Sequence, residues 1–169
     1  IYVRVNLASG FRAPNLAELA SNGVHEGTNR YEIGNSNLNN EQNFQMDTSL
    51  EFKNEHFEVF ANVFYNHINQ YIYIEPTNQI IEDNLVYQYT QDDAKLYGGE
   101  FGLHIHPHPL DWLHLSSSFE TVTGELLEGD YLPLQPANSL SNTLKIEFNN
   151  LGIFNKTFFS TTFKNTFKQ

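Results

Sequence analysis

Apolar and polar side chains alternate with a period of two along most of this chain. The clearest stretch runs from Phe44 to Phe52, where Phe, Met, Thr and Leu at even positions are interleaved with polar residues at odd positions. This alternation is typical of a β-strand with one apolar and one polar face. The same pattern predicts strands over 1–7, 57–75, 86–105, 112–123, 139–148 and from 151 onward. We therefore expect about seven strands, and we expect Pro76 to end the strand that begins at residue 57, because proline cannot donate a ladder hydrogen bond.

The predicted connections alternate between short and long. Short turns are predicted at 54–56, 107–109 and 149–150, and long polar connections at 10–42, 75–85 and 124–138. The first long connection contains a candidate helical turn over 14–20, with Pro14 near its first position and a short apolar repeat. Interleaved tight turns and long loops are the layout of bacterial outer-membrane barrels. The expected fold class is therefore all-β, an antiparallel up-and-down meander.

Composition narrows the possible functions. The chain has 20 acidic and 9 basic residues and a net charge of −11, so it lacks the clustered basic surface that a nucleic-acid partner requires. It has no cysteine, which excludes disulfides and thiolate metal sites. No nucleophile elbow, phosphate-binding loop, dinucleotide glycine pattern or zinc-protease helix is present, so we expect no enzymatic activity and no cofactor.

Three motifs occur in a fixed order. Ala-Ser-Gly-Phe-Arg-Ala-Pro-Asn-Leu-Ala-Glu-Leu spans 8–19, a Gly-Asn-x-x-Leu-x-x-Glu motif spans 34–41, and Asp93-Ala94 is followed by Tyr-Gly-Gly-Glu at 97–100. In this order they resemble motifs in the barrel domain of TonB-dependent outer-membrane receptors. The resemblance covers residue 1 to about residue 148.

The resemblance implies a partial segment of a transmembrane β-barrel of about 22 strands. The whole chain, 1–169, is then one partial barrel domain without the family's plug domain, and its start within a strand suggests an excised segment. The implied function is active import of a scarce nutrient, most simply a ferric siderophore or another metal chelate. The implied partners are the TonB–ExbB–ExbD system, acting through the plug, a small-molecule ligand, and outer-membrane lipid with lipopolysaccharide. The implied location is the Gram-negative outer membrane.

Candidate ligand-facing residues lie in the first long connection. Arg12 can clamp a carboxylate or position a loop through its planar guanidinium, and a loop-folding role is favoured. His25 and Glu26 are neighbours that could take part in binding a metal chelate, although two neighbours do not make a site. Arg30, in the same connection, is the other ligand-facing candidate.

Charged and imidazole side chains on the predicted strands form a second group. Glu100, Glu120 and Glu147 fall on polar faces, which would line a water-filled lumen. His104, His106 and His108 alternate, so an extended chain would place them on one face. Because they lie at the short-turn end, away from the ligand loops, we interpret them as a histidine-rich strand end and expect no metal site.

Two other classes of protein remain open. A soluble β-sandwich that binds carbohydrate would turn the same apolar faces towards a core. A small closed outer-membrane barrel of about eight strands, acting as an adhesin or anchor, would also fit the chain length. The order of the motifs and the uneven loops favour the receptor over both.

Overall fold

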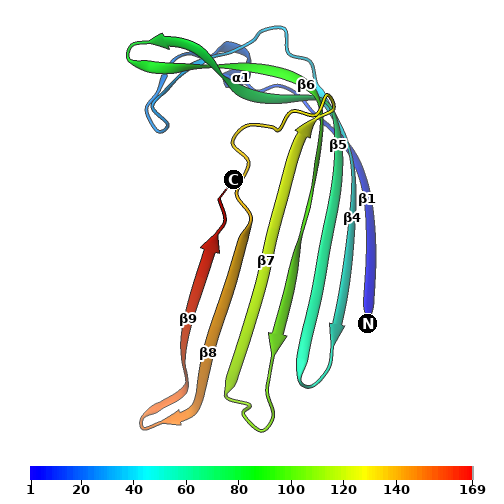
Figure 1. Cartoon of the computed structure of the whole chain (residues 1–169), viewed down its shortest axis with the longest axis vertical. Helices are drawn as coiled ribbons and strands as arrows, with labels where there is room; N and C mark the ends of the chain where they lie inside the picture. Colours follow the sequence, from blue (N-terminus) through cyan, green and yellow to red (C-terminus); the bar gives the residue numbers. More distant parts are fainter. Residues whose placement is uncertain (169) are drawn as a thin grey trace.

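The computed structural model, which describes residues 1–168, is one antiparallel sheet with a small lobe at one end (Figure 1). The strands follow the order β1-β4-β5-β6-β7-β8-β9, and we call these strands the wall. Their bounds are β1 Tyr2–Arg12, β4 Glu41–Lys53, β5 Phe57–Ile81, β6 Asn84–Ile105, β7 Leu113–Leu126, β8 Ser139–Leu151 and β9 Phe154–Thr166. The connection between β1 and β4 contains α1 (Leu16–Ala20), β2 (Asn22–His25) and β3 (Arg30–Ile33). The expected all-β antiparallel meander is confirmed.

The wall has two chemically different faces. One row of register partners crosses it as Val3, Leu50, Ala61, Phe101, Phe119 and Leu140. The adjacent row consists of the residues next to these in each strand: Arg4, Ser49, Asn62, Glu100, Glu120 and Ser139. Because neighbouring strand residues point to opposite sides, these rows lie on an apolar face and a polar face. We use these two names below.

The apolar face is uncovered. Its exposed side chains are Val3, Val5, Leu7, Phe44, Met46, Leu50, Val59, Val63, Tyr65, Phe101, Leu103, Leu115, Phe159 and Phe163. Phe101, in the middle of the wall, is 46% exposed. An exposed apolar area of this extent on a protein surface marks contact with lipid or with another protein. The side chains that are buried and apolar among the described residues are instead Leu38, Ile68, Ile72, Val86, Ala94 and Leu132, away from this face.

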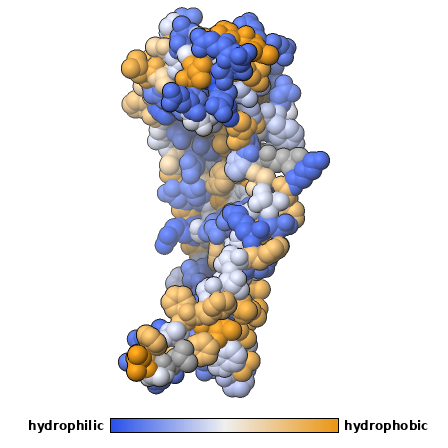
Figure 2. All heavy atoms as spheres, turned by 90° about the vertical axis from the view of Figure 1, so that its left-hand side faces the viewer, coloured by the Kyte–Doolittle hydropathy of each residue, from blue (hydrophilic) through white to orange (hydrophobic). Residues whose placement is uncertain are grey.

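The two ends of the wall differ. The turn end carries the connections 54–56, 106–112 and 152–153, and the other, outer end carries the long connections 13–40 and 127–138 together with the β5–β6 turn at 82–83. In Figure 2 the upper part, at the outer end, is mostly hydrophilic, while hydrophobic residues gather at the lower, turn end. None of the helices among residues 1–168 is long and apolar enough to cross a bilayer.

The strand that begins at Phe57 does not end at Pro76, so that prediction was wrong. β5 continues to Ile81 and pairs with β6 through a tight turn at Glu82 and Asp83, where a long loop was expected. Both turn residues have positive φ, 51° and 59°, as the favoured two-residue hairpin turns require. Pro76 is tolerated because the pairing register shifts directly after it.

The outer part of the β5–β6 hairpin bends away from the wall (Figure 1). A register shift between Ile68 and Tyr71 marks the bend. Within it, Gln70 has a φ of 58° and its backbone N–H donates to Asp93 Oδ1 at 2.9 Å. A bulge of this kind increases local twist and redirects a strand. We call residues 13–40, with the hairpin beyond Gln70, the outer lobe.

Candidate functional site at the outer end of the wall

Arg12 joins the outer lobe to the wall. Its Nε and Nη2 donate to the two carboxylate oxygens of Glu41 at 2.8 and 2.7 Å, and its Nη1 lies 2.9 Å from both oxygens of Glu18. Glu41 begins β4, and its Oε1 also accepts the backbone N–H of Ile72 in β5 at 2.7 Å. We call Arg12, Glu18 and Glu41 the Arg12 clamp. It connects the end of β1, helix α1, the start of β4 and, through Ile72, strand β5.

The two carboxylates of the Arg12 clamp are buried, whereas its guanidinium is partly exposed. The side chains of Glu18 and Glu41 are 11% and 10% exposed, whereas that of Arg12 is 44% exposed. The hydrogen bonds with Glu41, and then with Glu18, outweigh burial and raise the pKa of Arg12 above its ordinary value. All of its side-chain partners among the described residues are carboxylates. Since Nε, Nη1 and Nη2 all bind within the chain, we assign Arg12 a positioning role.

Helix α1 lies where the sequence predicts it, but for a different reason. Leu16 is 80% exposed while Glu18 is 8% exposed, so the apolar repeat does not bury the helix. The helix is held instead by a capping box, in which Asn15 Oδ1 accepts the N–H of Glu18 and Glu18 Oε2 accepts the N–H of Asn15. Glu18 therefore both caps the helix and completes the Arg12 clamp.

Two of the sequence motifs meet at the Arg12 clamp. The first motif supplies Arg12 and Glu18, and the second runs from Gly34 to Glu41. Between them, Asn35 N–H donates to the carbonyl of Glu18 at 2.8 Å. Leu38, in the middle of the second motif, is one of the buried apolar side chains. The motifs are therefore the two halves of one structural unit.

Gly34 provides a test of this unit. A Cβ at Gly34 would lie 2.5 Å from Ala20 N and 2.6 Å from Ser21 N, so Gly34→Ala must displace the end of α1. We expect it to cost about 1–3 kcal/mol, as overpacking does, and to expose 13–40 to protease. Gly23→Ala is the matched control, since a Cβ there has nothing within 4 Å. Equal protease resistance of the two variants would argue against the tight contact.

The ligand-facing candidates His25, Glu26 and Arg30 lie together on the β2–β3 hairpin. His25 and Arg30 are register partners, and Glu26 lies in the connecting turn. His25 and Glu26 are exposed, and Arg30 is half-buried with its guanidinium 4.7 Å from the ring centroid of Tyr87 in β6. The hairpin therefore presents an imidazole, a carboxylate and a guanidinium–aromatic pair on one small surface.

The hairpin is docked on the bent part of β6. β3 pairs with it in parallel over Tyr31, Glu32 and Ile33. The hydroxyl of Tyr89 donates to Glu32 Oε2 at 3.2 Å. Burial, and then the charge of Glu32, raise the pKa of Tyr89, which keeps its hydroxyl protonated as a donor. The candidate ligand surface is thus supported by main-chain and side-chain bonds.

The acidic candidates Glu100, Glu120 and Glu147 all lie on the polar face. Glu100 and Glu120 are register partners on β6 and β7. Glu120 Oε2 accepts a hydrogen bond from the Ser139 hydroxyl at 2.9 Å and lies 3.5 Å from Lys164 Nζ. Glu147 forms an ion pair with Lys145. The three carboxylates do not form one site.

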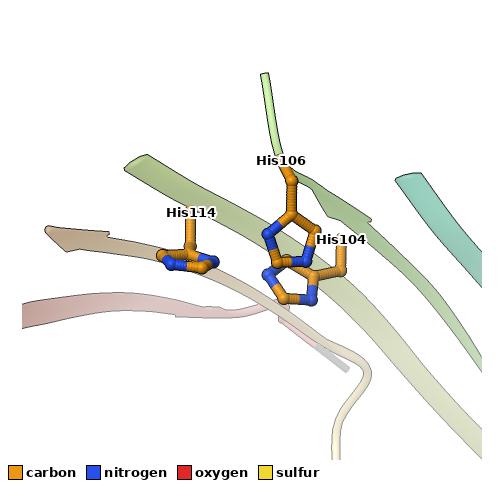
Figure 3. Close-up of side chains that lie close together, drawn as sticks. All are labelled: His104, His106 and His114. Atoms are coloured by element: carbon orange, nitrogen blue, oxygen red, sulfur yellow. The ribbon is translucent and has the colours of Figure 1, made fainter. Parts of the chain in front are cut away.

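The histidines at the turn end are grouped differently from the sequence pattern. His104 and His106 approach His114 of β7, and the nitrogens of the three imidazoles lie within 4.8 Å of one another (Figure 3). His108 turns away, with Nδ1 2.7 Å from Asp111 and its ring against His56. Sequence reasoning missed His114. The hairpin register was the available signal, because the Ile105–Leu115 pair implies that His106 faces His114 one step further.

A meander of antiparallel strands with an uncovered apolar face and a polar opposite face defines a section of an outer-membrane β-barrel wall. More specifically, the chain belongs to the TonB-dependent receptor β-barrel family. Residues 1–167 match the family described as "TonB dependent receptor-like, beta-barrel". Barrels of this family are outer-membrane proteins, so the chain is an outer-membrane protein.

Solved structures of receptors share the fold. Copper transporter OprC matches with a TM-score of 0.70 and 18% identity, over 86% of this chain and 21% of that one. The siderophore receptor PirA from Pseudomonas aeruginosa matches with a TM-score of 0.62 and 20% identity, over 96% of this chain and 30% of that one. A mutant of the ferric enterobactin receptor PfeA from Pseudomonas aeruginosa matches with a TM-score of 0.55 and 19% identity, over 85% and 23%. The chain thus spans between about a fifth and a third of the length of these receptors.

Proposed function

We propose that this chain, 1–169, is part of the barrel domain of an active-transport receptor that binds and imports a scarce nutrient. Gln169 lies outside the described residues. The observation that carries the proposal is the outer lobe, whose helix α1 is held to the wall by the Arg12 clamp and whose β2–β3 hairpin pairs with β6. Binding residues are commonly carried on loops that a rigid scaffold positions. The chain would take part in binding and passage rather than in a chemical reaction.

The ligand class that we propose is a ferric siderophore or another metal chelate. The Arg30–Tyr87 pair offers a cation and a π-face, which suit an anionic or aromatic chelate. The similar folds of a siderophore receptor, a ferric enterobactin receptor and a copper transporter support a metal-containing cargo. Energy would come from the TonB–ExbB–ExbD system through a plug domain in a closed barrel of about 22 strands. Outer-membrane lipid and lipopolysaccharide would surround the apolar face.

The structure gives no support to the alternative classes. A β-sandwich needs a second sheet over the apolar face, and residues 1–168 form one sheet. A small closed barrel needs its first and last strands to pair, and in the described chain β1 and β9 lie at opposite edges. The receptor proposal therefore accounts for the uncovered apolar face better than either alternative.

Growth on defined iron sources tests the transport proposal. A strain that lacks the gene should fail to grow on at least one ferric chelate as sole iron source, and the full-length gene should restore growth only when TonB is present. Restoration without TonB would contradict the energy coupling. Unchanged uptake of every ferric, haem, cobalamin and copper source by the deletion strain would contradict transport itself.

Arg30→Ala tests the proposed ligand surface. We expect it to weaken binding of the transported chelate by about tenfold, which is typical of losing an arginine anchor at a binding surface. Lys53→Ala is the matched control, because Lys53 is an exposed cation at the turn end and pairs only with Glu58 among the described residues. Radiolabelled chelate binding to whole cells measures both variants. Equal affinity of the Arg30 variant and the wild type would remove Arg30 from the site.

A further inference from the structure

The histidines His104, His106 and His114, which we call the His cluster, form a compact group of nitrogen donors at the turn end. Ring centroids are 4.1 Å apart for His104 and His106, 4.6 Å for His106 and His114, and 5.7 Å for His104 and His114. His104 is the penultimate residue of β6, His106 follows the strand, and His114 is the second residue of β7. The β6–β7 ladder therefore places His104 and His114, and His106 is held by its N–H, which donates to the carbonyl of His56 at 2.7 Å.

The ring nitrogens of the His cluster have few competing partners. The described residues provide no hydrogen bond to a ring nitrogen of His104 or His106. His114 Nε2 is buried and has no hydrogen-bond partner, and Glu147 Oε2 lies 3.6 Å from it, within ion-pair distance. A buried polar atom without a partner is unfavourable unless a ligand satisfies it. The nitrogens are thus available for a ligand that accepts several imidazoles at once.

We propose that His104, His106 and His114 bind one divalent first-row transition metal ion, Zn²⁺ or Cu²⁺. Neutral imidazole is a preferred ligand of these ions, and three imidazoles leave a further position for water or a passing ligand. A tetrahedral Zn²⁺ with bonds of about 2.0–2.1 Å needs ligand nitrogens about 3.4 Å apart. The observed nitrogens lie within 4.8 Å of one another, so small side-chain rotations close the site.

The surroundings of the His cluster are suited to a cation. Glu58 is the register partner of His104, and Glu147 lies beside His114. Lys53 pairs with Glu58, and Lys145 pairs with Glu147. The two lysines therefore balance the charges of the two carboxylates before the metal binds. The metal would connect β6 and β7 next to the 106–112 connection, and thereby stabilise the turn end.

The His cluster lies on the same face as Glu100 and Glu120, since even-numbered residues of β6 and β7 point to the polar face. That this face lines a transport pore rests on the proposed function. Metal binding itself rests only on the side-chain geometry. The site lies at the opposite end of the wall from the outer lobe, and so it is separate from the proposed ligand surface.

Competition with a chromophoric chelator tests the site. The full-length receptor, purified in detergent and stripped with a chelating agent, is titrated with Zn²⁺, and Co²⁺ absorption reports the ligand geometry. We expect the wild type to bind one ion more than the His104→Ala/His114→Ala variant at micromolar Zn²⁺. The double substitution should weaken binding at this site by about 100-fold or more, since loss of even an outer-shell partner costs 10–100-fold. His108→Ala is the matched control, because His108 lies at the same end and pairs with Asp111.

Equal Zn²⁺ stoichiometry and affinity in the wild type and the double variant would overturn the proposal, as would an equal loss in the His108→Ala variant. Heat-modifiable migration on gels checks that each variant is folded, and His114→Gln replaces the double variant if that one is not. Uptake assays on the same proteins separate the two proposals. A receptor that binds Zn²⁺ at this site but transports nothing contradicts only the proposed function, whereas one that transports but lacks the extra ion contradicts only the metal site.

Discussion

Replacing Arg12 with alanine is expected to detach the outer lobe from the wall. The substitution leaves Glu18 and Glu41 buried without their cation, and removing one member of a buried ion pair costs about 3–5 kcal/mol. We expect about 2–3 kcal/mol here, because the exposed side of the guanidinium reduces the effect. Limited proteolysis of outer membranes should then cut within 13–40 faster than it does in the wild type.

Two further variants make the Arg12 experiment specific. Arg12→Lys keeps the charge but loses the planar guanidinium that binds both carboxylates. We therefore expect its protease resistance to be closer to that of Arg12→Ala than to that of the wild type. Arg4→Ala is the control, since Arg4 lies on the same strand and face and has no ion pair within the described residues. Undiminished protease resistance in the Arg12→Ala variant would show that the Arg12 clamp does not hold the lobe.

Placing arginine at position 101 is expected to prevent most of the protein from inserting. Phe101 lies on the apolar face in the middle of the wall, and a charge on the lipid side of a barrel costs about 2–4 kcal/mol at the bilayer midplane. The amount of folded, heat-modifiable receptor in the outer membrane should therefore fall by about tenfold or more. Quantitative immunoblots of membrane fractions measure this amount.

The neighbouring residue provides the control for Phe101→Arg. Glu100→Arg places the same side chain one residue away, on the polar face beside Glu120, where water accommodates it. We expect near-normal insertion of this variant. If Glu100→Arg inserts less well than Phe101→Arg, the two faces have been assigned in reverse.

Alternation alone was sufficient to predict the wall. A strand with one apolar and one polar side must alternate apolar and polar residues. This alternation is visible in the sequence of 44–52 without knowing which strands pair with it. It failed beyond Gln70, where the β5–β6 hairpin leaves the wall and no single apolar face is required. There the polar sequence around Pro76 was interpreted as a loop, although a tight turn and a shifted register keep it in a ladder.

The candidate site was only partly predictable, because its partners are distant in sequence. Arg12 was one of the ligand-facing candidates, with a loop-folding role favoured, but its bond to Glu41 spans 29 positions and depends on the β1–β4 register. The capping box of Asn15 and Glu18 was a local signal that sequence reasoning did not use. His114 was missed for the same reason as Glu41, since a neighbouring strand supplies it.

The two ends of the β2–β3 hairpin lie next to each other, and β3 also pairs with β6. Gly34 N–H donates to the carbonyl of Ser21 at 2.7 Å, so the residues that flank the hairpin, Asn22–Ile33, are joined at its base. Changing the length of a loop whose ends are already fixed costs little free energy. A change in length at the turn 26–29, outside the β3–β6 pairing, should therefore leave the wall strands undisturbed.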